Sequence, residues 1–350
     1  MEPVNIGNRL IGPNHPPYII AEIGSNHNGD MDLCRRIIDA AVACGADAVK
    51  FQSWSKSSLI STQEYSRNIS YDDKKRHFGS LEAMVEKYQL TQDQHIAISA
   101  YCHEKKIAFL SSCFSPEEVD LLESLSVPAH KIASMDIVHV PLLEYVASTG
   151  KPIILSTGMA ALAEIDRAVD ILKSNGSGPI VLLHCISIYP PEYDDIHLNN
   201  IKMLEQTFQL PVGFSDHTIG TSIPLAAVAL GACIIEKHFT LDKNLAGWDH
   251  WISAEPDELK KIVEESRNIF NALGNYKRIV RQAEKEKRQK FRRCVVIKKP
   301  LKRGDRLSTK DIDFKRPGTG ISPDELKYIV GRSLKRDMKE DEELKWSDLQ

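Results

Sequence analysis

Eight short apolar runs recur along the first two-thirds of the chain, and segments of helix length separate them. The runs are Tyr18–Ile23, Ala48–Ser53, Ile107–Cys113, His130–Ser134, Pro152–Thr157, Ile180–Cys185, Pro211–Ser215 and Ile234–Thr240. The helix-like segments include Met31–Cys44, Pro116–Leu125, Leu142–Ser148, Ala161–Ser174 and Ile223–Leu230. Apolar strands that alternate with helices are typical of parallel strands buried on both faces. The pattern predicts a closed (β/α)8 TIM barrel over residues of about 15–275, and it leaves a doubly wound open sheet as the alternative.

The chain changes character after the eighth run. Pro256 opens a helix whose apolar residues keep helical spacing until Gly274, and the charged segment from Arg281 to Arg288 follows. From about Phe291 the sequence predicts short strands and Gly/Pro turns. We therefore expect a barrel over residues 1–280, a linker over 281–290 and a small β-rich module over 291–350. A module of roughly 60 residues is near the lower limit for independent stability, so it is expected to pack on the barrel or on a partner chain.

Composition narrows the class of protein. The net charge of −3 over 350 residues gives no overall attraction for nucleic acid or an anionic membrane. The seven cysteines are scattered with no C-x-x-C pair, which favours reduced thiols over a disulfide framework. No signal peptide is visible, and no apolar run is long enough to span a bilayer. These features predict a cytoplasmic protein.

Polar residues gather where the predicted strands end. They are Glu22, Lys50, Gln52, Ser111, Ser112, Lys131, Ser134, Asp136, Ser156, His184, Cys185, Ser187, Tyr189, Ser215, Asp216, His217, Glu236, Lys237 and His238. In (β/α)8 enzymes the carboxyl ends of the strands carry the chemistry. A single lysine or serine at a strand end is usually a solvated edge, but eight such ends together predict an active site.

Cations and hydroxyls at these ends indicate an anionic substrate. Lysine offers a compact positive charge, and serine hydroxyls donate hydrogen bonds to phosphate or carboxylate oxygens. The relevant residues are Lys50, Lys131, Ser134, Ser156 and Ser215. Neither a Walker A motif nor a G-x-G-x-x-G motif is present, so a nucleotide is not indicated.

Two histidines on the last two predicted strands suggest a metal. Imidazoles that reach one point from neighbouring strands, here His217 and His238, can bind a divalent cation and leave positions open for substrate. Glu22 is a candidate for a further ligand through water or for an acid/base group.

Seven motifs in order resemble the N-acetylneuraminate (sialic acid) synthase family over nearly the whole chain. They are Ile20-Ala-Glu-Ile-Gly-Ser-Asn-His-Asn-Gly, Val49-Lys-Phe-Gln, Lys131-Ile-Ala-Ser, Lys151-Pro-Ile-Ile-Leu-Ser-Thr-Gly-Met, Leu183-His-Cys, Gly213-Phe-Ser-Asp-His-Thr and Glu236-Lys-His-Phe-Thr. The segment Lys315-Arg-Pro-Gly-Thr-Gly-Ile resembles the antifreeze-like (SAF) domain of that family.

The resemblance implies an activity and a role for each matching residue. The implied reaction condenses phosphoenolpyruvate with a free N-acyl hexosamine and releases phosphate, with a divalent metal, preferably Mn²⁺ (alternatively Mg²⁺ or Co²⁺), at His217 and His238. Lys50, Lys131, Ser112, Ser134, Ser156 and Ser215 match positions around phosphoenolpyruvate. Positions lining the sugar or the reacting centre are matched by Glu22, Gln52, Asp136, Tyr189 and Asp249, with Glu22 as the acid/base. The family is a domain-swapped homodimer, in which Arg316 matches an arginine that contacts the sugar's acyl group in the partner's barrel.

Three departures from the family pattern lie near the expected sugar pocket. Asp136 follows Ser134-Met135 where sialic acid synthases often read Ser-Gly-Glu, and Ser187 stands where they read Asn. The loop Gly247–Trp251 carries two tryptophans in place of a Pro-Gly-Pro-Asp sequence. The acceptor is therefore open between N-acetylmannosamine and the 6-deoxy diacetamido sugars of legionaminic and pseudaminic acid synthases.

Two further alternatives remain on the sequence alone. A Schiff-base aldolase would use Lys50 or Lys131 as a nucleophile towards a carbonyl substrate. A non-enzymatic carbohydrate- or ice-binding protein would use only the C-terminal module, but it leaves the polar strand ends unexplained.

Overall fold

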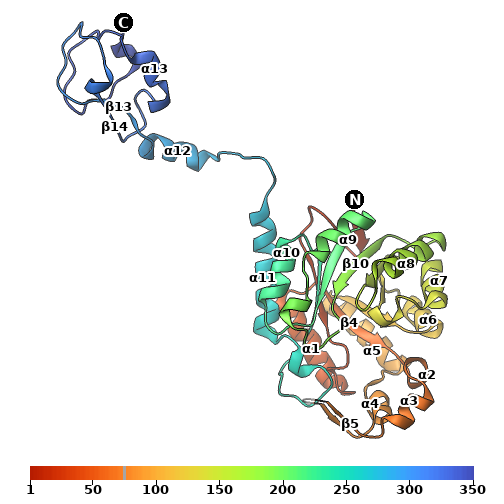
Figure 1. Ribbon diagram of the computed structural model, residues 1–350. Coiled ribbons are helices and arrows are strands. Elements are labelled where there is room, and N and C mark those ends of the chain that lie inside the picture. Colours follow the sequence, from red (N-terminus) through yellow and green to blue (C-terminus); the bar gives the residue numbers. More distant parts are fainter. Residues whose placement is uncertain (74–75) are drawn as a thin grey trace. The chain divides into compact units, whose positions relative to one another are not determined.

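The computed structural model describes residues 1–73 and 76–350, and the chain divides into two compact units, Met1–Gly274 and Asn275–Gln350. The first unit is a closed barrel of eight parallel strands in the order β10-β11-β12-β3-β4-β7-β8-β9 (Figure 1). The strands are β3 (Tyr18–Glu22), β4 (Ala48–Ser53), β7 (Ala108–Cys113), β8 (His130–Ile132), β9 (Ile153–Ser156), β10 (Ile180–Cys185), β11 (Val212–Asp216) and β12 (Ile234–His238). The predicted (β/α)8 barrel is confirmed, and the open sheet is excluded.

Helices connect the strands and pack on the outside of the barrel (Figure 1). They are α1 (Met31–Cys44), α5 (Gln92–Lys105), α6 (Pro116–Ser124), α7 (Val140–Ser148), α8 (Leu162–Ser174), α9 (Asn200–Phe208), α10 (Ser222–Ala229) and α11 (Pro256–Leu273). In α1 the buried residues Leu33, Ile37 and Ile38 share the face that meets the sheet. Asp30 accepts hydrogen bonds from the first-turn amides of α1, and Gly45 ends the helix at φ 80°, where a side chain would be strained.

Two apolar layers hold the barrel together because side chains alternate along each strand. Outward residues such as Phe51, Phe214 and Ile235 pack under the helices. Inward residues near the amino ends, such as Ile20 and Leu110, fill the barrel interior. The inside of the barrel is therefore solid at that end, and only the carboxyl ends leave room for polar side chains.

A hairpin that the sequence pattern did not predict packs against the inner apolar layer. Strands β1 (Val4–Ile6) and β2 (Arg9–Ile11) pair antiparallel, and Val4, Ile6 and Ile11 are buried in the same cluster as the inward barrel residues. Arg9 forms an ion pair with Asp47, whose other carboxylate oxygen accepts a hydrogen bond from the Ile19 amide at 2.9 Å.

A second unpredicted feature is an excursion between β4 and α5. It contains α2 (Lys56–Leu59), α3 (Thr62–Arg67), β5 (Tyr71–Asp73), β6 (Arg76–Phe78) and α4 (Leu81–Tyr88). A separate small core of Trp54, Tyr65, Val85 and Tyr88 supports it, and Phe114 joins that core from the end of β7. The excursion therefore packs against the carboxyl side of the barrel.

The second unit contains α12 (Gln282–Phe291), β13 (Cys294–Ile297), β14 (Ile312–Lys315) and α13 (Leu326–Ile329). Every residue of α12 is exposed or half-buried. β13 and β14 pair antiparallel over an apolar core that includes Val295, Ile297 and Leu334. This small antiparallel sheet agrees with the predicted β-rich module.

The structure describes the state of the cysteines and the apolar length of the helices. All seven cysteines are buried free thiols. Among the residues that the structure describes, no helix is both long and apolar enough to cross a membrane.

Buried neutral histidines make the stability of the fold depend on pH. His27 is 1% exposed and accepts a hydrogen bond from the Gly29 amide at 3.0 Å. Burial lowers the pKa of His27 from 6.5 to about 4. Between pH 6.5 and pH 4, His27 therefore carries a proton in the unfolded chain but not in the folded chain. The contribution to stability is complete above pH 6.5 and is lost as the pH falls towards 4.

We expect the free energy of unfolding to fall by about 1 kcal/mol through His27 when the pH drops from 7.5 to 5.5. His27→Asn keeps an acceptor for the Gly29 amide but does not titrate, so urea unfolding of this variant should depend less steeply on pH. His103→Asn, which changes an exposed histidine, is the matched control. Equal pH slopes for the wild type and His27→Asn would contradict the assignment.

Candidate active site

A cavity of about 370 Å³ opens at the carboxyl ends of the barrel strands. The residues that line it are Glu22, Lys50, Gln52, Ser112, Phe114, Lys131, Ala133, Ser134, Met135, Ser156, Met159, Cys185, Ser187, Tyr189, Ser215, His217, Glu236, His238, Trp248 and Asp249. All the site residues predicted from the sequence are in this set except Asp136 and Arg316. The strand ends thus bring together side chains that lie up to 227 positions apart, from Glu22 to Asp249.

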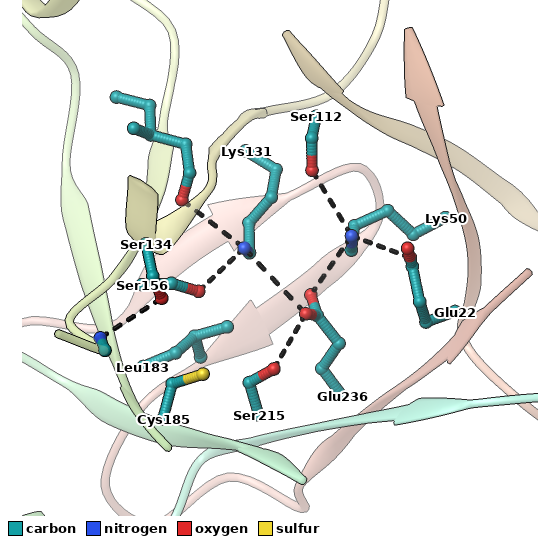
Figure 2. A network of polar contacts seen from close by, with 12 residues as sticks. Glu22, Lys50, Ser112, Lys131, Ser134, Ser156, Leu183, Cys185, Ser215 and Glu236 are labelled. Carbon is teal, nitrogen blue, oxygen red and sulfur yellow. Dashed lines mark hydrogen bonds and ion pairs between the residues drawn. The ribbon is translucent and has the colours of Figure 1, made fainter. Parts of the chain in front are cut away.

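The floor of the cavity is a network of buried opposite charges (Figure 2). Lys50 Nζ lies 2.7 Å from Glu22 Oε2, and both side chains are almost wholly buried. Glu236 stands between the two lysines, 3.8 Å from Lys50 Nζ and 3.8 Å from Lys131 Nζ. Ser215 Oγ donates a hydrogen bond to Glu236 at 3.0 Å. Each buried ammonium group therefore lies close to at least one buried carboxyl group.

Hydroxyl groups surround the two ammonium groups. Lys131 Nζ donates to Ser156 Oγ at 2.7 Å, and Lys50 Nζ donates to Ser112 Oγ at 3.3 Å. Ser134 Oγ accepts a hydrogen bond from the Gly158 amide at 3.1 Å. A Cβ at position 158 would lie 2.4 Å from Ser187 Oγ, so only glycine lets the backbone approach these hydroxyls. Ammonium and hydroxyl donors thus converge on one small volume, which suits an anion.

The local charges move the pKa values of these groups in opposite directions. Burial acts to lower the pKa of Lys50, but Glu22 and Glu236 outweigh it and the pKa is raised. Burial lowers the pKa of Lys131 more than Glu236, at 3.8 Å, raises it, so the pKa of Lys131 is lowered. Burial raises the pKa of Glu22 to about 7, against the lowering effect of Lys50. A carboxyl group poised near neutrality is suited to proton transfer.

The two predicted metal ligands lie side by side in the cavity wall. The ring centroids of His217 and His238 are 5.5 Å apart, and the ring of Tyr189 lies 4.1 Å from that of His217. His217 Nδ1 lies 2.8 Å from the carbonyl oxygen of Ile186. Because a carbonyl only accepts, Nδ1 carries a proton, and the neutral form of the ring presents the lone pair of Nε2. His238 Nδ1 lies 3.9 Å from the Asp249 carboxylate.

This donor set fits a divalent cation that completes its coordination with other oxygens. With metal–nitrogen bonds of about 2.1 Å, two imidazoles on one ion have ring centroids roughly 4.5–5.5 Å apart. A backbone carbonyl that fixes the Nδ1 proton is also the usual partner of a metal-binding histidine. Within residues 1–73 and 76–350, no three His, Cys, Asp or Glu side chains form a group able to hold a metal. Further ligands would therefore come from water or substrate.

Two predicted residues, Asp136 and Arg316, do not line the cavity. Ser134 and Asp136 belong to a 3-10 turn, Ser134–Asp136, and not to the predicted strand, because β8 ends at Ile132. In this turn the Asp136 carboxylate lies 3.5 Å from His139 Nδ1, and Met135 lines the cavity instead. Arg316 belongs to the second unit, where its guanidinium lies over the Phe291 ring at 5.3 Å.

Several cavity residues were missing from the predicted set. Glu236 was visible at a strand end, two residues before His238, and inward alternation places both on the same face. Met135, Met159, Phe114 and Trp248 supply an apolar side to the cavity. Because Met135 and Met159 follow strand ends in loops, no periodicity in the sequence shows where their side chains lie.

Comparisons with known proteins agree with the fold and identify the family. The sequence model of the NeuB family matches residues 37–278, and that of the SAF domain matches residues 292–350. An uncharacterized protein, MJ1065 of Methanocaldococcus jannaschii, is 44% identical over 349 residues, covering all of this chain and 99% of that protein. An N,N'-diacetyllegionaminic acid synthase of Campylobacter jejuni is 41% identical over 326 residues, covering 93% of this chain and 97% of the synthase.

A solved structure of a sialic acid synthetase has a similar fold and sequence. The N-acetylneuraminic acid (sialic acid) synthetase of Leptospira borgpetersenii, in complex with citrate, superposes with a TM-score of 0.74 at 37% identity. The match covers 82% of this chain and 95% of that structure.

Because Glu236 lies between Lys50 and Lys131, its replacement should change both the stability of the protein and the effect of phosphate on that stability. Glu236→Gln removes one partner of a buried charge network, so the free energy of unfolding should fall by about 3 kcal/mol. Inorganic phosphate should then raise the melting temperature of Glu236→Gln more than that of the wild type, because an anion replaces the lost carboxylate. Thermal melts with and without phosphate measure both effects.

The control is Glu82→Gln, which removes a half-buried glutamate paired with Lys56. This variant should melt like the wild type in either buffer. If Glu236→Gln also melted like the wild type without phosphate, the balancing role of Glu236 would be wrong.

Proposed function

Because the chain belongs to the NeuB family, we propose that it is a nonulosonic acid synthase that condenses phosphoenolpyruvate with a free N-acyl hexosamine. The observation that carries this proposal is the single cavity that holds a lysine–serine anion site next to two imidazoles. The family relationship makes the chain an enzyme of the sialic and legionaminic acid synthase type. The transferase chemistry and the acceptor are our proposals.

The proposed reaction forms one carbon–carbon bond and breaks one carbon–oxygen bond. The methylene carbon of phosphoenolpyruvate attacks the aldehyde carbon of the open-chain sugar, and the aldehyde oxygen gains a proton. Water adds to the former enol carbon, the bond from that carbon to the phosphate oxygen breaks, and inorganic phosphate leaves. The product is an acidic sugar three carbons longer than the acceptor.

The floor residues supply the site for phosphoenolpyruvate. Lys50 and Lys131 balance its phosphate and carboxylate charges, while Ser112, Ser156 and Ser215 provide hydroxyl donors around them. Ser134 adds a fourth hydroxyl beside the Gly158 amide. Since Lys50 is already paired with Glu22, an incoming anion competes with a carboxylate for it.

Glu22 is the proposed acid/base group. Its pKa of about 7 lets it hold or release a proton near neutral pH, and Gln52 donates a hydrogen bond to its Oε1 at 2.8 Å. The contact with Gln52 fixes the orientation of the carboxyl group. Glu22 can therefore exchange a proton with the reacting water or the aldehyde oxygen.

His217 and His238 would hold the divalent metal, which we propose to be Mn²⁺. When bound, it supplies Lewis acidity that stabilises negative charge on the aldehyde oxygen. The Ile186 carbonyl keeps His217 in the tautomer that presents Nε2, and Asp249 flanks His238. These neighbours orient the imidazoles for that role.

An apolar part of the cavity favours a deoxy sugar as the acceptor. Met135, Met159 and Trp248 line the cavity, while Asp136 is turned towards His139. Apolar side chains suit a methyl group better than a hydroxymethyl group. The 41% identity to a legionaminic acid synthase points the same way. We therefore propose a 6-deoxy diacetamido hexose as the acceptor, with N-acetylmannosamine as the alternative.

One observation favours a second reaction, a Schiff-base aldolase. Burial lowers the pKa of Lys131, as a nucleophilic lysine requires. Against it, Lys131 Nζ already donates to Ser156 and to the Ile132 carbonyl, which suits a fixed cation. Lys131 is the residue at which the two reactions make opposite predictions.

We also propose that the chain acts as a homodimer with exchanged SAF domains. In that arrangement Arg316 would contact the acyl group of the acceptor. The Phe291 ring beneath its guanidinium gives the side chain a defined direction.

The proposed reaction is tested by phosphate release with phosphoenolpyruvate and a panel of free aldoses. We expect release only when both substrates are present, with a 6-deoxy diacetamido hexose used best and mass spectrometry showing a product three carbons longer. Release without an aldose, or none with any aldose, would contradict the proposal. Borohydride with pyruvate should leave Lys131 unmodified; a covalent adduct would favour the aldolase.

Metal removal tests the role of the two histidines. Chelation with EDTA should abolish turnover and Mn²⁺ should restore it. His217→Ala and His238→Ala should each lower kcat by at least 100-fold at saturating phosphoenolpyruvate, since each removes one of the two protein ligands. His184→Ala changes a buried histidine outside the cavity lining and should lower kcat much less. Full activity in EDTA would exclude the metal role.

A further inference from the structure

A buried ion pair lies directly behind the two imidazoles. Asp216 precedes His217 at the end of β11, Lys237 precedes His238 at the end of β12, and the two strands pair Asp216 with Lys237 in register. Lys237 Nζ lies 2.7 Å from Asp216 Oδ2, and both residues are only 1% exposed. Because side chains alternate along a strand, the pair lies on the opposite face from the imidazoles.

The same pair also holds the backbone around His217. Asp216 Oδ1 accepts a hydrogen bond from the Thr218 amide at 2.9 Å. Lys237 Nζ donates to the Thr218 carbonyl oxygen as well as to Asp216. His217 is thus enclosed between two residues that Lys237 contacts, and Lys237 is itself the neighbour of His238. One ammonium group therefore links the two histidines through short, buried contacts.

Packing alone does not explain why positions 216 and 237 carry charged side chains. The neighbouring outward residues Phe214, Ile235 and Phe239 all belong to the apolar layer under the helices. A buried ion pair in such a layer contributes little net stability, because desolvation offsets the attraction between the charges. What it does provide is a fixed distance and direction between two strand ends.

We propose that Asp216 and Lys237 are positioning residues that set the separation and orientation of His217 and His238 for a divalent metal. This inference rests on the proposed metal role of the two histidines. The ion pair joins the strand ends, the Thr218 contacts fix the turn after His217, and the Ile186 carbonyl fixes its ring. Without the pair, the two imidazoles sample a wider range of separations. Metal affinity is then lower, because part of the binding free energy is used to order them.

The test replaces the pair without leaving one charge unpaired. Asp216→Leu/Lys237→Met removes both charges and keeps similar volumes, so the fold should survive. Asp216→Asn/Lys237→Met is a milder variant that keeps an acceptor for the Thr218 amide but loses the link between the strands. Mn²⁺ affinity of the full-length protein is measured by electron paramagnetic resonance and calorimetry, and the melting temperature is measured without metal.

The matched control is Arg9→Met/Asp47→Asn. It removes another ion pair whose carboxylate also accepts a backbone amide, at the amino end of the barrel. We expect both Asp216/Lys237 variants to bind Mn²⁺ at least tenfold more weakly, with melting temperatures within a few degrees of the wild type, and the control to bind normally. Excess Mn²⁺ should restore most of kcat in the variants, since His217 and His238 are still present.

The outcomes separate the inference from the function on which it rests. Unchanged Mn²⁺ affinity in a folded Asp216/Lys237 variant would overturn the positioning role and leave the proposed synthase intact. An equal loss of affinity in the Arg9/Asp47 control would also overturn it, because the effect would then follow from general destabilisation. A wild type that binds no Mn²⁺ would overturn both the metal role and the inference, while phosphate release reports on the reaction separately.

Discussion

Two ammonium groups buried at the end of a barrel impose a constraint on everything around them. Lys50 and Lys131 are each 3% exposed, and a charge so far from water is costly unless carboxylates or strong acceptors stand close by. Glu22 and Glu236 meet that requirement from β3 and β12, on either side of the strand junction. The closed barrel is what makes this possible, because strands distant in sequence end at the same place. Charge balance at this site therefore depends on barrel closure.

The sequence predicted the barrel well because the signal repeats. Each strand is a short apolar run, and the polar residues at each end share the inward face with their neighbours two positions away. That alternation placed Lys50 and Gln52 on one face. The order of the predicted strands brought His217 and His238 together, because the last two strands are neighbours. The same alternation places Glu236 on the inward face, because it precedes His238 by two residues.

Other features had no periodic signal. The β1–β2 hairpin consists of strands of three residues, which are too short to show alternation. Asp136 was placed at the sugar by its match to a position of the resembling family. The Asp136 amide instead donates to the Ala133 carbonyl and closes a 3-10 turn, which moves Met135 to the cavity. In a turn, side-chain direction follows from local hydrogen bonds that a single sequence does not reveal. The orientation of Arg316 relative to a barrel is of the same kind, because it depends on assembly.

The apolar filling at the amino end of the barrel bears on how molecules enter the cavity. Val4, Ile6 and Ile11 pack against the inward residues, so apolar side chains fill this end, and the cavity lies at the carboxyl ends of the strands. Lys50 and Lys131 are at the floor, whereas Met135 and Met159 are 57% and 70% exposed. The lysines are therefore at the buried end of the cavity, and the two methionines are at its exposed end. For the proposed reaction, this difference in depth predicts that the anionic substrate binds before the sugar.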